Sequence, residues 1–270
     1  MRRSERLIRW GARRPVLSVL LLLSAVICTP LAIRALEVDE PNAQDRQIVR
    51  TIAKRMKLFH LSNQDMDDDI SKKGFQLYLK SLDPSKMYFY QSDIDEFSAS
   101  ADELDDLAKS GDLSFAFAVF NRFLKRIEER LVVINQLIES EHDFTLDEVM
   151  MTDSDELEFA KNPAELKDRW RKRIKYSMLV EKSEETANED AKNKLNRRYT
   201  SFAKRMNQFD AEEVTELFLT SLTTAYDPHS TYFSQSTFDN FMIQMRLNLE
   251  GIGASLQSED GVTVLSLIHI

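Results

Sequence analysis

The sequence predicts a mainly α-helical chain that ends in a short β segment. Only six of the 270 residues are Gly, and sheets and tight turns depend on Gly more than helices do. Apolar residues recur at helical spacing from about residue 42 to residue 249. Three of the six Gly, namely Gly251, Gly253 and Gly261, fall in the last twenty residues. The fold class is therefore expected to change near residue 250, and the 43% apolar content excludes a disordered chain.

Residues 1–36 have the pattern of an export leader. Six Arg precede the apolar run Val16–Ile27, which is shorter than the roughly 20 residues of a membrane-spanning helix. A basic segment followed by such a run is typical of a secretory signal peptide. An uncleaved N-terminal anchor in the inner membrane is the alternative. Cys28 does not fit a lipidation site well, because Val26 and Ile27 stand where small residues are preferred.

The net charge and the Cys content of residues 37–270 indicate what kind of domain follows the leader. The whole chain carries −9 and residues 1–36 carry +6, so residues 37–270 carry −15. This acidic balance argues against nucleic acid as the main partner. Residues 37–270 also lack Cys, so an exported domain has to be stabilised by its apolar core without disulfides. The expected location is the periplasm.

Helical patterns cover most of residues 37–248, which we expect to form one helical domain. Asn162 and Pro163 mark a helix start, because Asn is a favoured N-cap and Pro is favoured in the first turn. Beyond Gly251 the residues alternate between apolar and polar, and Asp260-Gly261 predicts a hairpin turn. The predicted helices are 42–61, 66–82, 114–140, 163–178, 184–208, 211–225 and 236–249, and the predicted strands are 254–257 and 262–265.

An internal repeat links two of these regions. The segment 83–97 and the segment 227–241, which starts 144 positions later (83 against 227), are identical at eight of fifteen positions. Asp-Pro ends a helix, Tyr-Phe is expected to plug the following turn into the core, and Ser92 and Ser236 are expected to cap the next helix. Two copies of a structural corner are the favoured interpretation, and a pair of ligand-binding loops is the alternative.

Other polar patterns favour structural roles. Asp65, Asp67 and Asp69 have the alternating spacing of a calcium loop, but Gly and Glu are missing from the positions where that loop requires them. Acidic residues at a helix N-terminus explain them better. The four His lack neighbours at metal-ligand spacing. We therefore expect neither a metal site nor a cofactor.

The segment Leu249–Ala254 carries the clearest functional pattern. Gly251 and Gly253 flank Ile252 just before a predicted strand. Such a turn can point successive backbone N–H groups at an anion. A peptide carboxylate bound there could continue along the strand by β-augmentation, the mode in which PDZ domains bind C-termini. Gly251, Ile252 and Gly253 are thus candidate carboxylate binders.

These motifs together resemble a known family. Asp227-Pro228-His229-Ser230-Thr231-Tyr232, followed by Leu249-Glu250-Gly251-Ile252-Gly253-Ala254, is similar to the N-terminal region of the tail-specific proteases, also called C-terminal processing peptidases. The stretch Phe75–Phe97 is similar to the helical N-terminal domain of the same family. The resemblance covers residues 40–264.

The resemblance implies a function. It implies a periplasmic serine endopeptidase in which a helical domain precedes a PDZ domain and a protease domain with a Ser–Lys dyad. The PDZ domain would capture protein substrates with apolar C-termini, with Leu249 as a pocket wall or hinge. A lipoprotein adaptor is expected on the helical part.

The sequence departs from the family pattern at its C-terminal end. Residues 249–264 would be only the start of a PDZ domain, and neither dyad residue follows, so no catalytic residue is assigned. Residues 265–270 match the translation of a transposase adaptor used in sequencing libraries, and we expect them to be non-native. The rival interpretation is a non-enzymatic periplasmic helical scaffold or adaptor that binds proteins.

Overall fold

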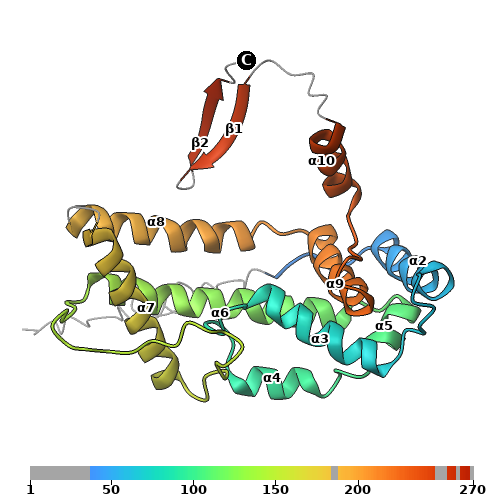
Figure 1. The fold of residues 1–270 in the computed structure, drawn as a ribbon, viewed down its shortest axis with the longest axis horizontal. Coiled ribbons are helices and arrows are strands. Elements are labelled where there is room, and N and C mark those ends of the chain that lie inside the picture. The colour runs from blue at the N-terminus through green and yellow to red at the C-terminus, as the bar shows by residue number, and fades with distance from the viewer. Residues whose placement is uncertain (1–36, 184–187, 247–253, 260–261, 268–270) are drawn as a thin grey trace, which may run out of the picture. The chain divides into compact units, whose positions relative to one another are not determined.

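The computed structural model describes residues 37–183, 188–246, 254–259 and 262–267, and it is mainly helical (Figure 1). The chain divides into the units Met1–Ala35 and Leu36–Ile270, of which only the second has described residues. The predicted leader therefore lies outside the described residues. No helix in the described ranges combines the length and apolar character needed to cross a membrane.

The first two described helices begin where their capping residues predict. Helix α2 spans Ala43–Phe59, and its cap Asn42 accepts the N–H groups of Gln44 and Asp45. Helix α3 spans Asp68–Leu82, and its cap Asp67 accepts the N–H groups of Asp69 and Ile70 at 3.1 Å each. Asp67 therefore acts as a helix cap, as the sequence predicts.

Two short helices connect α3 to the long helix α6. Helix α4 spans Gln91–Ser98, α5 spans Leu104–Ser110 and α6 spans Ser114–Glu139. The sequence analysis missed α5. That helix ends at Gly111, whose φ of 74° is left-handed, and a Cβ there would lie 2.5 Å from the carbonyl oxygen of Arg46. Only Gly fits this close approach.

The second half of the domain contains four helices. Helix α7 spans Pro163–Ser183, α8 spans Asn188–Met206, α9 spans Ala211–Tyr226 and α10 spans Gln235–Arg246. The predicted cap at Asn162 is confirmed, because its Oδ1 accepts the N–H of Glu165 at 2.9 Å. Between α6 and α7, residues 140–162 form a long segment without helix or strand.

A short β-hairpin follows the helical domain. Strand β1 (Ala254–Glu259) pairs with β2 (Val262–Leu267) in antiparallel register, with Ala254 opposite Leu267 and Glu259 opposite Val262. Two-stranded hairpins occur in many folds. The assignment of this hairpin to a PDZ domain therefore stays a prediction.

The apolar side chains form two clusters that meet at Tyr88. The first cluster joins α2, α3, α5 and α9 to the N-terminal half of α6, and the second joins α7 and α8 to the C-terminal half of α6. The Tyr88 ring lies 5.4 Å from Phe123, 5.6 Å from Trp170 and 5.6 Å from Phe202, measured between centroids. One side chain from the repeated sequence thus packs against both clusters.

The sequence repeat is a structural repeat. Helix α3, the loop 83–90 and helix α4 correspond to α9, the loop 227–234 and α10. In each copy the first Gln of the second helix donates to an Asp four residues later at 2.9 Å. Phe89 and Phe97 lie 5.7 Å apart between ring centroids, and Phe233 and Phe241 lie 5.4 Å apart.

The two copies pack against each other through α3 and α9. A Cβ on Gly74 would lie 2.7 Å from Leu222 Cδ2, so Gly lets the helices approach closely. Tyr78 packs edge-on against Phe218 at 5.8 Å. Gly74 is equivalent to Phe218 in the repeat, and Tyr78 is equivalent to Leu222. Exchanging the two copies therefore converts one contact into the other, which indicates a local two-fold relation.

One prediction about the repeat is wrong. Ser92 and Ser236 do not cap the second helix of each copy, because those helices begin one residue earlier, at Gln91 and Gln235. In the second copy Ser234 precedes the helix, and its Oγ accepts the N–H of Thr237 at 3.3 Å.

Candidate functional site

The predicted carboxylate-binding residues lie outside the described residues. Leu249, Gly251, Ile252 and Gly253 all belong to the range 247–253, for which the structure describes nothing. Strand β1 begins at Ala254, the next residue in the chain. Within the helical domain, the two repeat loops and the surfaces beside them are the candidates that the structure does describe.

The first loop is organised by the buried carboxylate of Asp83. Its two oxygens accept the N–H groups of Met87, Tyr88 and Phe89 at 2.8, 2.8 and 3.0 Å. The residue is 2% exposed. Burial raises its pKa, while the three backbone donors and the charge of Arg130 act in the opposite direction. Asp83 thus supplies the acceptors that the turn itself does not provide.

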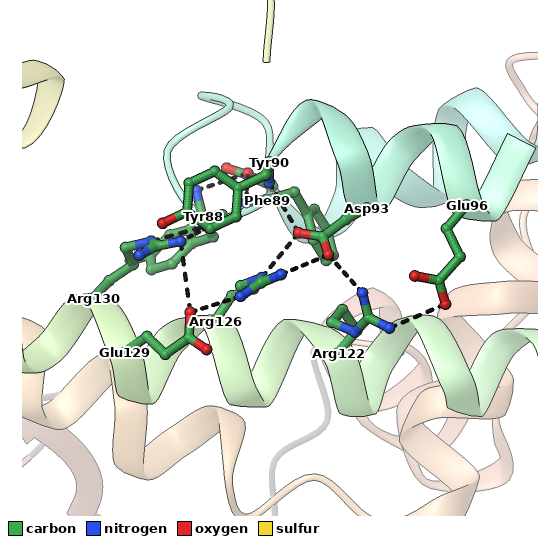
Figure 2. A network of polar contacts seen from close by, with 10 residues as sticks. Tyr88, Phe89, Tyr90, Asp93, Glu96, Arg122, Arg126, Glu129 and Arg130 are labelled. Atoms are coloured by element: carbon green, nitrogen blue, oxygen red, sulfur yellow. Dashed lines mark hydrogen bonds and ion pairs between the residues drawn. The ribbon is translucent and has the colours of Figure 1, made fainter. Parts of the chain in front are cut away.

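The helix after this loop is attached to α6 by ion pairs (Figure 2). Asp93 accepts Arg122 Nη1 at 2.6 Å, Arg126 Nη2 at 2.7 Å and Arg126 Nε at 2.9 Å. It also accepts the N–H of Tyr90 at 2.9 Å. Burial alone would raise the pKa of Asp93, but these donors lower it overall.

The same arginines lie against aromatic rings. The guanidinium carbons of Arg126 and Arg130 lie 4.7 and 4.4 Å from the centroid of the Tyr90 ring, and that of Arg122 lies 5.7 Å from the Phe97 ring. Such cation–π contacts stabilise the charged guanidinium groups in these positions, in addition to the ion pairs. The α6 side chains that contact α4 are therefore arginines, while Phe123 of α6 packs on Phe89 in the loop before α4.

The first loop also holds the segment before α7. Trp170 Nε1 donates to the Met87 carbonyl at 2.8 Å, and Lys86 Nζ donates to the Leu157 carbonyl at 2.5 Å. Tyr90 forms an isolated parallel bridge with Ala160. These contacts join the first loop to α7 and to the segment before it, so the interpretation of the repeat as a structural corner fits the first copy.

The second loop is open to solvent. The Asp227 carboxylate accepts the N–H of His229 at 3.0 Å and contacts His229 Nδ1 at 2.9 Å. The side chains of Asp227 and His229 are 40% and 91% exposed. The loop is tied to α2 through His60, whose Nε2 lies 3.0 Å from Ser230 Oγ.

An acidic cavity lies beside the second loop. It has a volume of about 640 Å³, and the acidic side chains Asp39, Glu40, Asp45, Asp210 and Glu212 line it together with aromatic residues of the loop and of α10. Burial raises the pKa of Tyr232, and the negative charges of Glu212, Glu216 and Asp45 raise it further. The cavity is therefore an electronegative pocket with aromatic walls.

A second hollow lies between the segment 144–152 and α7. Two cavities of about 210 and 350 Å³ share Val149, Met150, Thr152 and Lys172. Glu148 fastens the segment to α7 by accepting Arg171 Nη2 and Lys175 Nζ at 2.5 Å each, and these partners lower its pKa to about 2. The large apolar side chains on this surface include Leu146, Val149, Met151, Tyr176 and Leu179, which are 51–84% exposed.

The polar patterns considered for metals are dispersed. Asp65 pairs with Lys57 at 3.0 Å, while Asp67 caps α3. In the part of the chain that the structure describes, no group of three His, Cys, Asp or Glu side chains is placed to hold a metal ion.

Comparison with known proteins identifies the family. Residues 52–236 match the family model described as the tail-specific protease N-terminal domain. The chain belongs to this family. A relative, the tail-specific protease of Haemophilus influenzae (strain ATCC 51907 / DSM 11121 / KW20 / Rd), is 32% identical over 216 residues. The alignment covers 79% of this chain and 31% of that protein, so the chain spans about a third of the relative's length.

The tail-specific protease domain match contains both repeat loops but ends at the start of α10. Sequence analysis found the loops from their repeated residues but missed the acidic cavity. Its lining comes from three separate stretches, around residues 39–48, 210–212 and 232–238. The only sequence signal for it was the acidic character of the first two stretches.

Proposed function

We propose that this chain is the N-terminal part of a periplasmic serine endopeptidase that recognises the C-termini of its substrates through a PDZ domain. The membership of the tail-specific protease family carries the proposal. The helical domain would hold the start of the PDZ domain, and peptide cleavage would depend on a Ser–Lys dyad beyond residue 270. We therefore expect no peptide hydrolysis by the 270-residue chain itself.

The segment Leu249–Gly253 is proposed as the carboxylate site. It directly precedes β1, so a bound peptide could add to the edge of that strand opposite β2. Successive N–H groups of Gly251, Ile252 and Gly253 would donate hydrogen bonds to the carboxylate oxygens. Leu249 would form an apolar wall for the last side chain of the substrate or act as a hinge.

A lipoprotein adaptor is proposed on the helical domain. The hollow between residues 144–152 and α7 is the described surface that suits it best, because large apolar side chains are exposed there beside Lys172 and Lys175. The same surface would also suit a helical scaffold without protease activity. The protease function requires that peptide binding depends on the C-terminal carboxylate, whereas the scaffold function does not.

A binding experiment tests the carboxylate site. A fluorescent peptide with an apolar C-terminus is titrated with the full chain, once with a free carboxylate and once as the amide. We expect the free acid to bind at least tenfold more tightly. Ile252→Pro should abolish this difference because it removes a backbone donor, whereas Ile252→Val keeps the donor and should preserve it. Equal binding of acid and amide would favour the scaffold.

A further inference from the structure

The exposed aromatic face of α10 is the feature that the function above does not use. Phe238, Phe241 and Met245 follow one another at helical spacing and are 46%, 40% and 64% exposed. Phe241 packs on Phe233 of the preceding loop. Exposed apolar side chains gathered on one helix face are typical of an interaction surface.

The first copy of the repeat shows how the equivalent face is covered. Phe97, the counterpart of Phe241, is 6% exposed, and Phe89, the counterpart of Phe233, is 0% exposed. Helix α6 covers them: Phe123 packs on Phe89 at 5.6 Å and Arg122 lies over the Phe97 ring. Arg122 also pairs with Asp93 (Figure 2).

The second copy keeps a carboxylate and aromatic rings at the equivalent positions, but no helix in the described part of the chain covers its α10 as α6 covers α4. Thr237 replaces Asp93, and its hydroxyl donates to Glu216 Oε2 at 2.9 Å, so a carboxylate still lies at this position. Asp39, Glu40 and Glu212 extend the negative charge into the adjoining cavity, which Phe233 and Phe238 also line. Arg122 and Arg126 of α6 cannot serve this surface as well, because both pair with Asp93 of α4.

We propose that the α10 face and the adjoining acidic cavity form a docking surface for an amphipathic helix of a partner protein. This helix would present an arginine followed directly by an aromatic residue, as α6 presents Arg122 to α4 and Phe123 to Phe89 in the loop before α4. The aromatic residue would pack on Phe233 and Phe241. The arginine would lie between an aromatic ring and the carboxylates of Glu212 and Glu216. Arginine and aromatic residues are enriched in such interfaces.

A peptide of α6 itself is the probe, because it carries the required side chains in a known arrangement. A fluorescent peptide of residues 114–139 is titrated with the full chain, and anisotropy is recorded. The matched control peptide carries Arg122→Ala and Phe123→Ala. We expect the unaltered peptide to bind at least tenfold more tightly than the control, and more weakly at high salt.

Variants of the chain locate the binding site. Phe241→Glu and Glu212→Lys should each weaken binding at least tenfold, because both side chains are exposed and belong to the proposed surface. Val132→Glu and Glu156→Lys, which alter exposed residues elsewhere, should leave it unchanged. Circular dichroism should show that all four variants keep their helical content.

Three results would overturn the proposal. The first is equal binding of the two peptides. The second is full affinity of the peptide for Phe241→Glu, which would mean that the peptide exchanges with the chain's own α6. The third is self-association of the full chain in sedimentation experiments that Phe241→Glu abolishes, because a second copy would then cover the face. None of these results depends on the carboxylate site at residues 249–253.

Discussion

The two copies of the repeat have the same backbone plan but different surroundings. In the first copy the loop carboxylate is buried, its Tyr joins two apolar clusters, and α6 covers the second helix. In the second copy the loop carboxylate is exposed and aromatic side chains of α10 face solvent. The difference shows that shared residues determine the local turn, while the neighbouring elements decide whether it braces the core or offers a surface.

The largest expected effect comes from the Tyr that plugs each loop. Tyr88→Ala should lower the free energy of unfolding by about 4 kcal/mol, because it leaves a cavity between two clusters. Tyr232→Ala should cost only about 1 kcal/mol, since that side chain is partly exposed. Urea denaturation measures both values. Equal losses would contradict the view that only the first loop is a brace.

Removing the loop carboxylates should also lower the free energy of unfolding by different amounts in the two copies. Asp83→Ala leaves three N–H groups of a buried turn without acceptors, and should cost about 3 kcal/mol. Asp227→Ala removes an exposed contact with His229 and should cost less than about 1 kcal/mol. The same denaturation experiment checks both variants. A large loss for Asp227→Ala would mean that the second loop also depends on its carboxylate.

The ion pairs of Asp93 should make the first copy sensitive to acid. The pKa of Asp93 is lowered in the folded protein, so its contribution to stability is present above the unfolded value of about 3.9 and is lost as the pH falls through the lower folded value. Asp93→Asn should cost about 2 kcal/mol at pH 7. This difference from the unaltered chain should shrink below about pH 4. Thr237→Ala, at the equivalent position, should show no such pH dependence.

The smallest effect should be the same in both copies. Gln91 and Gln235 each donate to an Asp one turn later on an exposed helix face. Gln91→Ala and Gln235→Ala should each change the free energy of unfolding by less than about 0.5 kcal/mol. Helical content and denaturation midpoints measure the two variants side by side. A clear difference between them would show that even the shared helix start depends on its surroundings.

Sequence patterns located most helices but not their partners. The predicted helices at 66–82, 114–140 and 211–225 agree with α3, α6 and α9 to within two residues at each end, because apolar spacing and caps act over a few residues. Helix α5 was missed because seven residues are too few for a periodic pattern. The start of the second helix in each repeat was predicted wrongly from Ser92 and Ser236. A Ser inside the first turn of a helix cannot be told from an N-cap Ser by sequence alone.

The candidate surfaces were less accessible to prediction. The family resemblance is confirmed by the match over residues 52–236, which contains Asp227–Tyr232 but not Leu249–Ala254. The roles of Leu249, Gly251, Ile252 and Gly253 stay predictions, as do the leader, the PDZ domain and the tail at residues 265–270. The acidic cavity and the uncovered face of α10 depend on segments more than 150 residues apart, between which no local pattern exists.

The sequence by itself determined the helical class, the helix cap at Asn162, the repeat and the family, because each depends on the order of neighbouring residues. Only the tertiary structure decided which copy of the repeat is buried. Asp83 and Asp227 belong to the same Asp-Pro motif, yet the side chain of Asp83 is buried and that of Asp227 lies at the surface. Burial is set by the elements that pack against a loop, and these come from distant parts of the chain.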